Sequence, residues 1–455
     1  MAAARWNRLN MRKLIAARLA SEGTLGQALI KAAIGSIGIK LAYTAIGFTI
    51  ATLTARLLGP GGFGIYSFAM AVISFLVIPS ELGIPALATR EMAVNRAKSD
   101  WPRMRGFILW AHRAIGTFSV VLIVGGAATL YLRADVTNEQ QTRSIALGLL
   151  LVPLLSLGAL RAAMLRGLRK VVLCQLPEMI IKPLLVVTAL ALMMVFARDR
   201  LTPSVVMVIQ ILATTVAFAF GLYFYFRNRP PELAQARPVD DSRAWFRSTV
   251  PFALMAGLAL INGQTDILAL GMFRDHAEVG IYRVAVQMAT LVIFGLQVIN
   301  PIQGPHIAHL YALGDMRRLQ QMVTRSSQGV LLLTLPVVLV LVLFGKPLIS
   351  LLFGPRFEAA YLPLVILCIG QLVNAATGSV RSILNMTGNE RDSTRSLLIG
   401  SIVNVALNLT LTPLWGMVGA AVATSVTLIV WNMLMLRAVR RRTGIDTSPL
   451  LRRKV

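Results

Sequence analysis

Long apolar runs constrain this chain more than any other feature. Twelve segments of mostly apolar residues follow one another, and a bilayer-spanning helix needs about 20 such residues. They are residues 33–57, 63–88, 107–131, 143–165, 171–196, 203–226, 247–272, 279–304, 328–352, 359–386, 395–414 and 416–437. Transmembrane β-strands are about ten residues long and alternate in polarity, so these runs exclude a β-barrel. The sequence therefore predicts an all-α polytopic membrane protein.

The composition agrees with a membrane protein. Only 14% of the residues are charged and 56% are hydrophobic, whereas a soluble domain has about 25% charged residues. The net charge is +26, which in a soluble protein would suggest a nucleic-acid partner. Here the basic residues fall in short loops between the apolar runs. Membrane topology explains them better, and we expect no nucleic-acid partner.

The distribution of basic residues predicts the orientation. The first 30 residues lack the continuous apolar core of a signal peptide, so we expect residues 1–30 to form a retained cytoplasmic arm. The inward segments are then 1–30, 89–106, 166–170, 227–246, 305–327, 387–394 and the C-terminal tail. About 30 of the 45 Lys and Arg residues lie in or beside them, against about seven outside. Those seven are Arg56, Arg133, Arg143, Arg198, Arg200, Arg274 and Arg356. Both termini are therefore predicted to be cytoplasmic.

A duplicated motif predicts two similar halves. Gly64–Ile65–Tyr66 recurs 216 residues later as Gly280–Ile281–Tyr282, and Pro85 falls on Pro301 at the same offset. Six spans precede a basic segment and six follow it, so both halves have the same orientation. Transporters with such parallel repeats bind substrate between the halves. We predict an N-lobe (31–226), a basic cytoplasmic linker (227–246), a C-lobe (247–437) and a basic cytoplasmic tail (438–455), with a central cleft between the six-helix lobes.

The glycine-rich stretch Leu58–Gly62 raises the possibility of a phosphate-binding loop. A Walker A loop continues with Gly-Lys-Ser/Thr, but here Phe63–Gly64–Ile65 follow. The stretch is better explained as a tight turn between two spans. The two cysteines, Cys174 and Cys368, lie inside apolar runs without a CxxC pattern or a histidine partner. They are predicted to be buried, with no metal site and no cofactor.

Polar residues recur at helical spacing inside several spans. Intramembrane ionisable residues usually face a cavity or a partner, and residues three, four or seven apart share a helix face. Such sets are Ser67, Ser74 and Glu81 in the second span; Arg283, Gln287, Thr290 and Gln297 in the eighth; Gln371, Asn374, Arg381 and Asn385 in the tenth; and Ser401, Asn404 and Asn408 in the eleventh. They are predicted to line a shared cavity, although Asn and Ser stripes also join helices.

Several charged residues leave alternatives open. Glu178 and Lys182 have the spacing of an intrahelical ion pair. Asp266 could pair with Lys40 or Arg283 across the cleft, or bind a proton or sodium ion. Basic residues near the ends of spans could extend to the lipid headgroups. Those residues are Lys31, Arg113 and Arg161 at inner ends, and Arg283 and Lys346 at outer ends.

Five segments together resemble a known family. They are LLGPGGFGIYSFAMAVISFL (57–76), ELGIPALATRE (81–91), AEVGIYRVAVQMATL (277–291), FGPRFEAAYLPLVIL (353–367) and GNERDSTRSLLIGSIVNVALNLTLTPLWGMVGAAVAT (388–424). They resemble the polysaccharide-transporter branch of the MOP exporter superfamily, which includes Wzx-type flippases. The resemblance implies two six-helix lobes around a V-shaped cleft in a bacterial inner membrane. It also implies transfer of polyprenyl-diphosphate-linked oligosaccharides to the periplasmic leaflet, beside a polymerase and glycosyltransferases.

The polar residues suit such a substrate. A diphosphate is bound by Arg or Lys, so Lys40, Arg283 and Arg381 are the candidate anion contacts. Gln287, Gln371 and Asn374 are placed nearer the sugar, and Glu81 and Asp266 are also assigned to the cleft. These roles are hypotheses from the residues, because substrate residues differ between members of the family.

Other functions fit less well. A cation-coupled multidrug antiporter of the same superfamily would need acidic residues deep in one lobe, where Asp266 stands alone in the seventh span. A lipid II flippase shares the physics but matches the span count and the second-span motif less well. An enzyme would need clustered carboxylates, and the inward loop 227–246 has only Glu232, Asp240 and Asp241. We expect a transporter and no catalytic residues.

Overall fold

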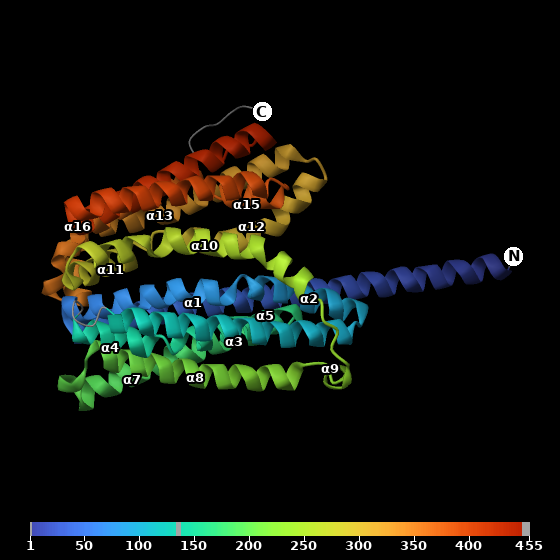
Figure 1. Ribbon diagram of the computed structural model, residues 1–455. Helices are drawn as coiled ribbons and strands as arrows, with labels where there is room; N and C mark the ends of the chain where they lie inside the picture. Colours follow the sequence, from blue (N-terminus) through green and yellow to red (C-terminus); the bar gives the residue numbers. More distant parts are fainter. Residues whose placement is uncertain (1, 133–137, 448–455) are drawn as a thin grey trace.

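The computed structural model describes residues 2–132 and 138–447, and all regular structure in this part of the chain is helical (Figure 1). Arg133 and the last eight residues of the predicted basic tail lie outside it. The first half contains α1 (Ala2–Glu81), α2 (Ile84–Lys98), α3 (Trp101–Leu132), α4 (Glu139–Gly148), α5 (Leu151–Gly167), α6 (Val171–Leu176), a π-helix (Pro177–Ile181), α7 (Lys182–Phe196), α8 (Pro203–Asn228) and the short α9 (Glu232–Gln235).

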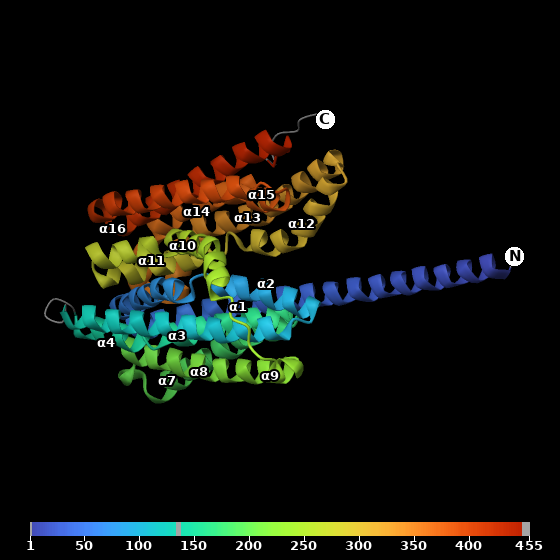
Figure 2. The ribbon, with the colours of Figure 1, turned by 45° about the vertical axis from the view of Figure 1, so that its right-hand side comes forward.

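The second half has a similar set of helices. It contains α10 (Ser242–Phe273), α11 (His276–Ala289), α12 (Phe294–Ala312), α13 (Met316–Phe353), α14 (Tyr361–Thr377), α15 (Val380–Met386) and α16 (Glu390–Thr443), with a 3-10 turn at Pro355–Ala360. The two halves form two helical layers, blue to green and yellow to red in Figures 1 and 2. The N-terminal part of α1 extends beyond the bundle at the end that also holds α9.

Two of the long helices each contain two membrane spans. In α1 the backbone leaves the helical region only at Gly59 (φ 66°, ψ 178°), and in α16 only at Gly416 (φ 56°, ψ −134°). Positive φ is costly for residues other than glycine, so each glycine permits a reversal within one residue. The predicted tight turn at Leu58–Gly62 is confirmed. Nine helices of the described residues are long and apolar enough to cross a membrane, and the two reversals divide them into eleven spans. The pair α11 and α12 forms the twelfth, as predicted.

Four predicted spans are interrupted. The second breaks at Leu82–Gly83, where both residues have positive φ, between α1 and α2. The fourth breaks at residues 149–150 between α4 and α5. The eighth breaks at residues 290–293 between α11 and α12, and the tenth breaks at Gly378 (φ 68°) between α14 and α15. Broken helices are typical of transporters, because freed backbone groups are tolerated where they face protein or a cavity.

The duplicated motif marks a contact between the two halves. A Cβ atom on Gly64 would lie 1.6 Å from the carbonyl oxygen of His276, and one on Gly280 would lie 2.1 Å from that of Pro60. Both pairs of equivalent residues, Pro60 with His276 and Gly64 with Gly280, are separated by 216 residues. Gly64 therefore meets His276 of the second half in the same way as Gly280 meets Pro60 of the first half, as a two-fold axis between the halves requires. This geometry confirms the parallel repeat and explains why both copies keep glycine here.

The connection between the halves is held against α3. Val239 donates its amide to the carbonyl of Pro102 (3.1 Å), and the carbonyl oxygen of Val239 lies where a Cβ of Gly106 would be. The guanidinium of Arg105 donates to the carbonyl oxygens of Ala234 and Ala236, both at 2.7 Å. We call residues 229–241 the linker, and the end of the bundle that carries it the linker face. The other end, which carries Gly59, is the turn face.

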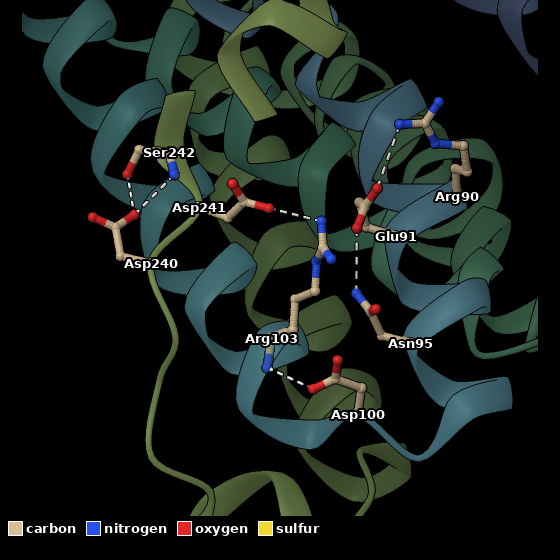
Figure 3. A network of polar contacts seen from close by, with 8 residues as sticks. All are labelled: Arg90, Glu91, Asn95, Asp100, Arg103, Asp240, Asp241 and Ser242. Carbon is tan, nitrogen blue, oxygen red and sulfur yellow. Dashed lines mark hydrogen bonds and ion pairs between the residues drawn. The ribbon is translucent and has the colours of Figure 1, made fainter. Parts of the chain in front are cut away.

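Charged contacts complete this attachment (Figure 3). Arg103 in α3 forms an ion pair with Asp241 (2.7 Å), and its amide donates to Asp100 (3.1 Å). The amide and hydroxyl of Ser242 both donate to Asp240, which lowers the pKa of that exposed carboxyl below its usual value. Exposed ion pairs contribute about 0–1 kcal/mol each, so the close fit at Gly106 matters more than the charges.

We expect Gly106→Val to displace the linker, because Val239 leaves no room for a side chain. Endoproteinase Glu-C should then cleave after Glu232 in the linker several-fold faster than in the wild type, as measured by limited proteolysis in detergent. Gly125→Val on the same helix is the control, because a Cβ at Gly125 would meet nothing within 4 Å. Equal cleavage rates in the two variants would show that the linker is not held by this contact.

Candidate functional site

The two halves are joined at the turn face. Arg56 in α1 donates to the backbone carbonyls of Leu351 and Leu352 at the C-terminal end of α13. The end of a helix leaves such carbonyls without partners, and a guanidinium satisfies them. Aromatic pairs Phe48–Phe353 (5.8 Å between centroids) and Phe63–Phe357 (6.3 Å) extend the contact. Together with the glycine crossing, these contacts close the space between the halves at this face.

Asp266 is held inside the second half. The hydroxyl of Tyr282 donates to its Oδ2 at 2.7 Å, Thr424 approaches the same oxygen at 3.5 Å, and the amide of Ile267 donates to Oδ1 at 2.8 Å. The residue is 7% exposed, and no basic side chain of the described residues pairs with it. The suggestion that Asp266 pairs with Lys40 or Arg283 is therefore wrong.

The two copies of the motif tyrosine have different surroundings. Tyr282 is fully buried against Asp266, whereas Tyr66 in α1 is half-buried and lies within electrostatic range of Arg283. The position equivalent to Asp266 in the first half is Ile50. Thus the tyrosine of the second half has a carboxylate partner, and the equivalent position in the first half supplies none.

The candidate cations are accessible and unpaired. Lys40 in α1 is exposed, Arg283 in α11 is half-buried, and neither forms an ion pair with a side chain that the structure describes. Gln287 lies one turn after Arg283 and is also half-buried. Glu81 is half-buried at the last residue of α1, beside the tight contact of Gly83 with Phe252 and Ala253 of α10. Lys40, Arg283 and Gln287 therefore remain candidates for anion and sugar contacts.

The helix breaks correct two predicted polar faces. Gln297 does not share a helix face with Arg283, because the chain between them leaves the helix at residues 290–293. Arg381 does not share one with Gln371, because α14 ends at Thr377. Within α14, Asn374 donates to Gln371 Oε1 (3.2 Å), and both side chains are half-buried.

The break in the tenth span forms a polar cluster of its own. Ser379 Oγ lies 2.6 Å from Asn300 Oδ1 and 2.8 Å from Gln303 Oε1 of α12. The hydroxyl of Thr377 donates to Asn432 of α16 (3.2 Å). These side chains join the helices where backbone bonding is interrupted, a role that the sequence pattern did not indicate.

The polar stripe of the eleventh span joins helices. Ser401, Asn404 and Asn408 are at most 3% exposed. Asn262 in α10 donates to Ser401 Oγ (2.6 Å), and Asn404 donates to Thr427 in the second span of α16 (3.4 Å). Such bonds stabilise helix packing in the bilayer. The expectation that this stripe lines the cavity is wrong.

The ion pair of Glu178 in the first half is formed with Arg161, and not with Lys182 as predicted. Arg161 in α5 is 1% exposed and pairs with Glu178 at 3.1 Å, while the predicted pair of Glu178 with Lys182 is absent. Arg161 also donates to the carbonyls of Ala217 and Phe218. It does not extend to the headgroups as expected. Lys346 likewise pairs with Glu358 (3.4 Å).

Two glycines and a π-helix make room for this pair. A Cβ on Gly221 would lie 1.4 Å from the Arg161 guanidinium, and one on Gly158 would lie 3.1 Å from the Glu178 carboxylate. Glu178 lies in the π-helix Pro177–Ile181, a rare geometry that often marks functional sites. These glycines lie in helices far apart in the chain, so helical spacing in the sequence did not indicate this pair.

The described residues contain no metal site. No group of three or more His, Cys, Asp or Glu residues is arranged to hold a metal ion there. Cys174 and Cys368 are free and buried, as predicted.

A comparison with known families decides the classification. Residues 29–305, more than half of the chain, match the model of a family described as polysaccharide biosynthesis protein. The chain belongs to this family. The match includes the motifs of the second and eighth spans, so the resemblance inferred from them to the polysaccharide-transporter branch of the MOP superfamily is confirmed.

The individual proteins that this chain resembles share about a quarter of its residues in the aligned regions. The probable low-salt glycan biosynthesis flippase Agl15 of Haloferax volcanii is 26% identical over 172 residues, which are 37% of this chain and 36% of that protein. The chain thus spans about a third of the length of this relative. The lipid II flippase MurJ of Bacillus subtilis is 24% identical over 465 residues, covering 88% of this chain and 80% of that protein.

A solved structure shows the same fold. The inward-facing form of a multidrug resistance MATE family transporter of the MOP superfamily matches with a TM-score of 0.71 at 13% identity. The match covers 90% of this chain and 98% of that one. This likeness confirms the predicted architecture of about twelve helices in two lobes. We therefore call the first half (α1–α8) the N-lobe and the second half (α10–α16) the C-lobe.

Proposed function

We propose that this protein moves polyprenyl-diphosphate-linked oligosaccharides across the bacterial plasma membrane by alternating access. The units would serve surface polysaccharide such as O-antigen, capsule or exopolysaccharide. The observation that carries this proposal is the turn face, which is closed by the glycine crossing with Arg283 of the C-lobe one turn away. Lys40 of the N-lobe is exposed, and neither cation forms an ion pair within the described part of the chain. Membership of the polysaccharide biosynthesis family supports the substrate class.

The lobes would divide the work on such a substrate. Arg and Lys are the usual partners of phosphate oxygens. Lys40 lies 19 residues, or about 28 Å, before Gly59 along α1, so it would bind the diphosphate nearer the linker face and Arg283 would bind it nearer the turn face. Gln287, Gln371 and Asn374 would contact the glycan with amide groups. The lipid tail would stay in the bilayer while the headgroup passes between the lobes. The units that move would be those predicted, 31–226 and 247–437, connected by the linker.

The proposed orientation follows from the basic residues. The linker face carries basic residues in the linker, at the end of α2 and the start of α3, in the turn after α5, and at the end of α16. Short cytoplasmic loops carry such an excess. Both termini and the linker would then be cytoplasmic in the inner membrane, where glycosyltransferases deliver the substrate and a polymerase receives it on the other side. The proposed role is transport, with no enzymatic step.

The test is lipid-linked sugar accumulation in a strain lacking this gene. Wild-type protein should restore surface polysaccharide, while Lys40→Ala and Arg283→Ala should restore it poorly, with transport reduced about tenfold or more. That is the loss expected from removing one charge-assisted hydrogen bond. Arg325→Ala is the control, because Arg325 is exposed and unpaired near the linker face. Membrane levels are measured by immunoblot.

Two alternatives rest on particular observations. Asp266 is a buried carboxylate without a cationic partner, as a cation-coupled multidrug antiporter would need. The match to MurJ over most of the chain favours a lipid II flippase. Unchanged surface polysaccharide with reduced drug tolerance would support the first. Accumulation of lipid II would support the second. Either result would contradict the oligosaccharide proposal.

A further inference from the structure

A small pocket lies between three helices of the C-lobe, near the linker face. Its walls are Met255 and Leu258 of α10, Arg381 and Asn385 of α15, and Ser393, Thr394 and Leu397 of α16. Its empty volume, including the open mouth, is ≈ 300 Å³. Of the three cations predicted to contact an anion in the cleft, the pocket includes Arg381 and neither Lys40 nor Arg283.

Arg381 is an uncompensated charge in this pocket. Its side chain is exposed and forms no ion pair or hydrogen bond with the described residues. The acidic residue nearest in sequence to the polar wall, Asp392, is bound to Arg442 at 2.8 Å. On the first turns of α16, Arg391 and Arg395 are exposed and outweigh the single negative charge of Glu390, which is also exposed. The pocket is thus cationic and ready to accept an anion.

The polar side chains of the pocket suit phosphate. An arginine can donate two parallel hydrogen bonds to phosphate oxygens. Asn385 lies one helical turn from Arg381, and the hydroxyl groups of Ser393 and Thr394 lie on the facing helix. Met255, Leu258 and Leu397 form an apolar wall beside them. A ligand with both a phosphate and an apolar chain would match both parts of the lining.

The depth of the pocket indicates a lipid. Arg381 lies six residues before the turn at Thr387 on the linker face, which corresponds to about 9 Å along a helix. The headgroup region of one leaflet is about 5–8 Å thick, outside a hydrocarbon core of about 30 Å. Arg381 therefore lies near the boundary between the headgroups and the hydrocarbon of the leaflet at the linker face.

We infer that this pocket binds the phosphate of a lipid headgroup from the linker-face leaflet. If the lipid is the prenyl-diphosphate-linked substrate, which rests on the proposed function, the pocket holds it before it reaches Lys40 and Arg283. An anionic phospholipid offers the same chemistry. In both cases Arg381 binds the phosphate oxygens, and the apolar wall contacts the first carbons of the lipid chain.

The experiment measures binding of geranylgeranyl diphosphate to the full-length protein in nanodiscs of neutral lipid. We expect Arg381→Gln to raise the Kd about tenfold or more, Arg381→Lys to recover part of the affinity, and geranylgeraniol, which lacks phosphate, to bind weakly. Arg325→Gln is the matched control. Circular dichroism confirms that each variant is folded. Repeating the titration with phosphatidylglycerol in the nanodisc shows whether the pocket accepts a phospholipid phosphate as well as a prenyl diphosphate.

Competition by phosphatidylglycerol that depends on Arg381 would assign the pocket to headgroup phosphate in general, and its absence would assign it to prenyl diphosphates. Equal Kd values for wild type and Arg381→Gln, or an equal loss in Arg325→Gln, would overturn the inference. These outcomes are independent of the proposed function. Binding that depends on Arg381 without oligosaccharide transport would leave the pocket standing, and transport without such binding would refute only the pocket.

Discussion

Gly64→Ala and Gly280→Ala should each prevent the lobes from closing at the turn face. The new Cβ atom would lie 1.6 Å or 2.1 Å from a backbone carbonyl oxygen of the other lobe. Ordinary contact requires about 3.4 Å, so the helices must separate, because backbone cannot move aside as a side chain can. Alternating access needs this face to close in each cycle, and we expect transport to fall at least about tenfold, a change of ~1.4 kcal/mol.

The measurement is a pulsed EPR distance between spin labels at Glu139 in the N-lobe and Leu362 in the C-lobe, both exposed. The alanine variants should shift the population to longer distances. Gly61→Ala is the matched control, because it lies one turn earlier and a Cβ there meets nothing within 4 Å. Alanine favours a helix over glycine by about 1 kcal/mol, so this control should be neutral or slightly stabilising. An unchanged distance in Gly64→Ala would refute the role of the crossing.

Arg161→Met should lower the free energy of unfolding by about 3 kcal/mol. Breaking a buried ion pair by removing one partner costs about 3–5 kcal/mol, and the lower end applies because the Glu178 side chain is 28% exposed. The carbonyls of Ala217 and Phe218 also lose a donor. Thermal and denaturant unfolding in detergent, followed by circular dichroism, would measure the change.

A second substitution separates charge from packing. Arg161→Met combined with Glu178→Gln should recover much of the lost stability, because no uncompensated carboxylate remains. Arg113→Met is the control, since Arg113 is exposed and forms no ion pair. If Arg161→Met alone unfolds like the wild type, Lys182 would have replaced the arginine as partner of Glu178.

The candidate site was only partly predictable. Lys40, Arg283, Gln287, Gln371 and Asn374 remain accessible or half-buried, as a polar face predicts. Helical spacing identifies residues on one face of a helix but does not reveal what packs against that face. Ser401, Asn404 and Asn408 have the correct spacing, yet the second span of α16 covers them. Spacing also assumes an unbroken helix, which fails at residues 290–293 and at Gly378.

The sequence by itself determined the number of spans, their common orientation in both halves and the reversals at Gly59 and Gly416. These features follow from local causes: the free energy of burying apolar runs in lipid, and a backbone conformation that only glycine adopts readily. Only the tertiary structure decided which partners Arg161 and Asp266 have and that Arg381 has none among the described residues. A charged side chain pairs with whatever neighbouring helices bring within about 4 Å, and that distance depends on packing between residues far apart in the chain.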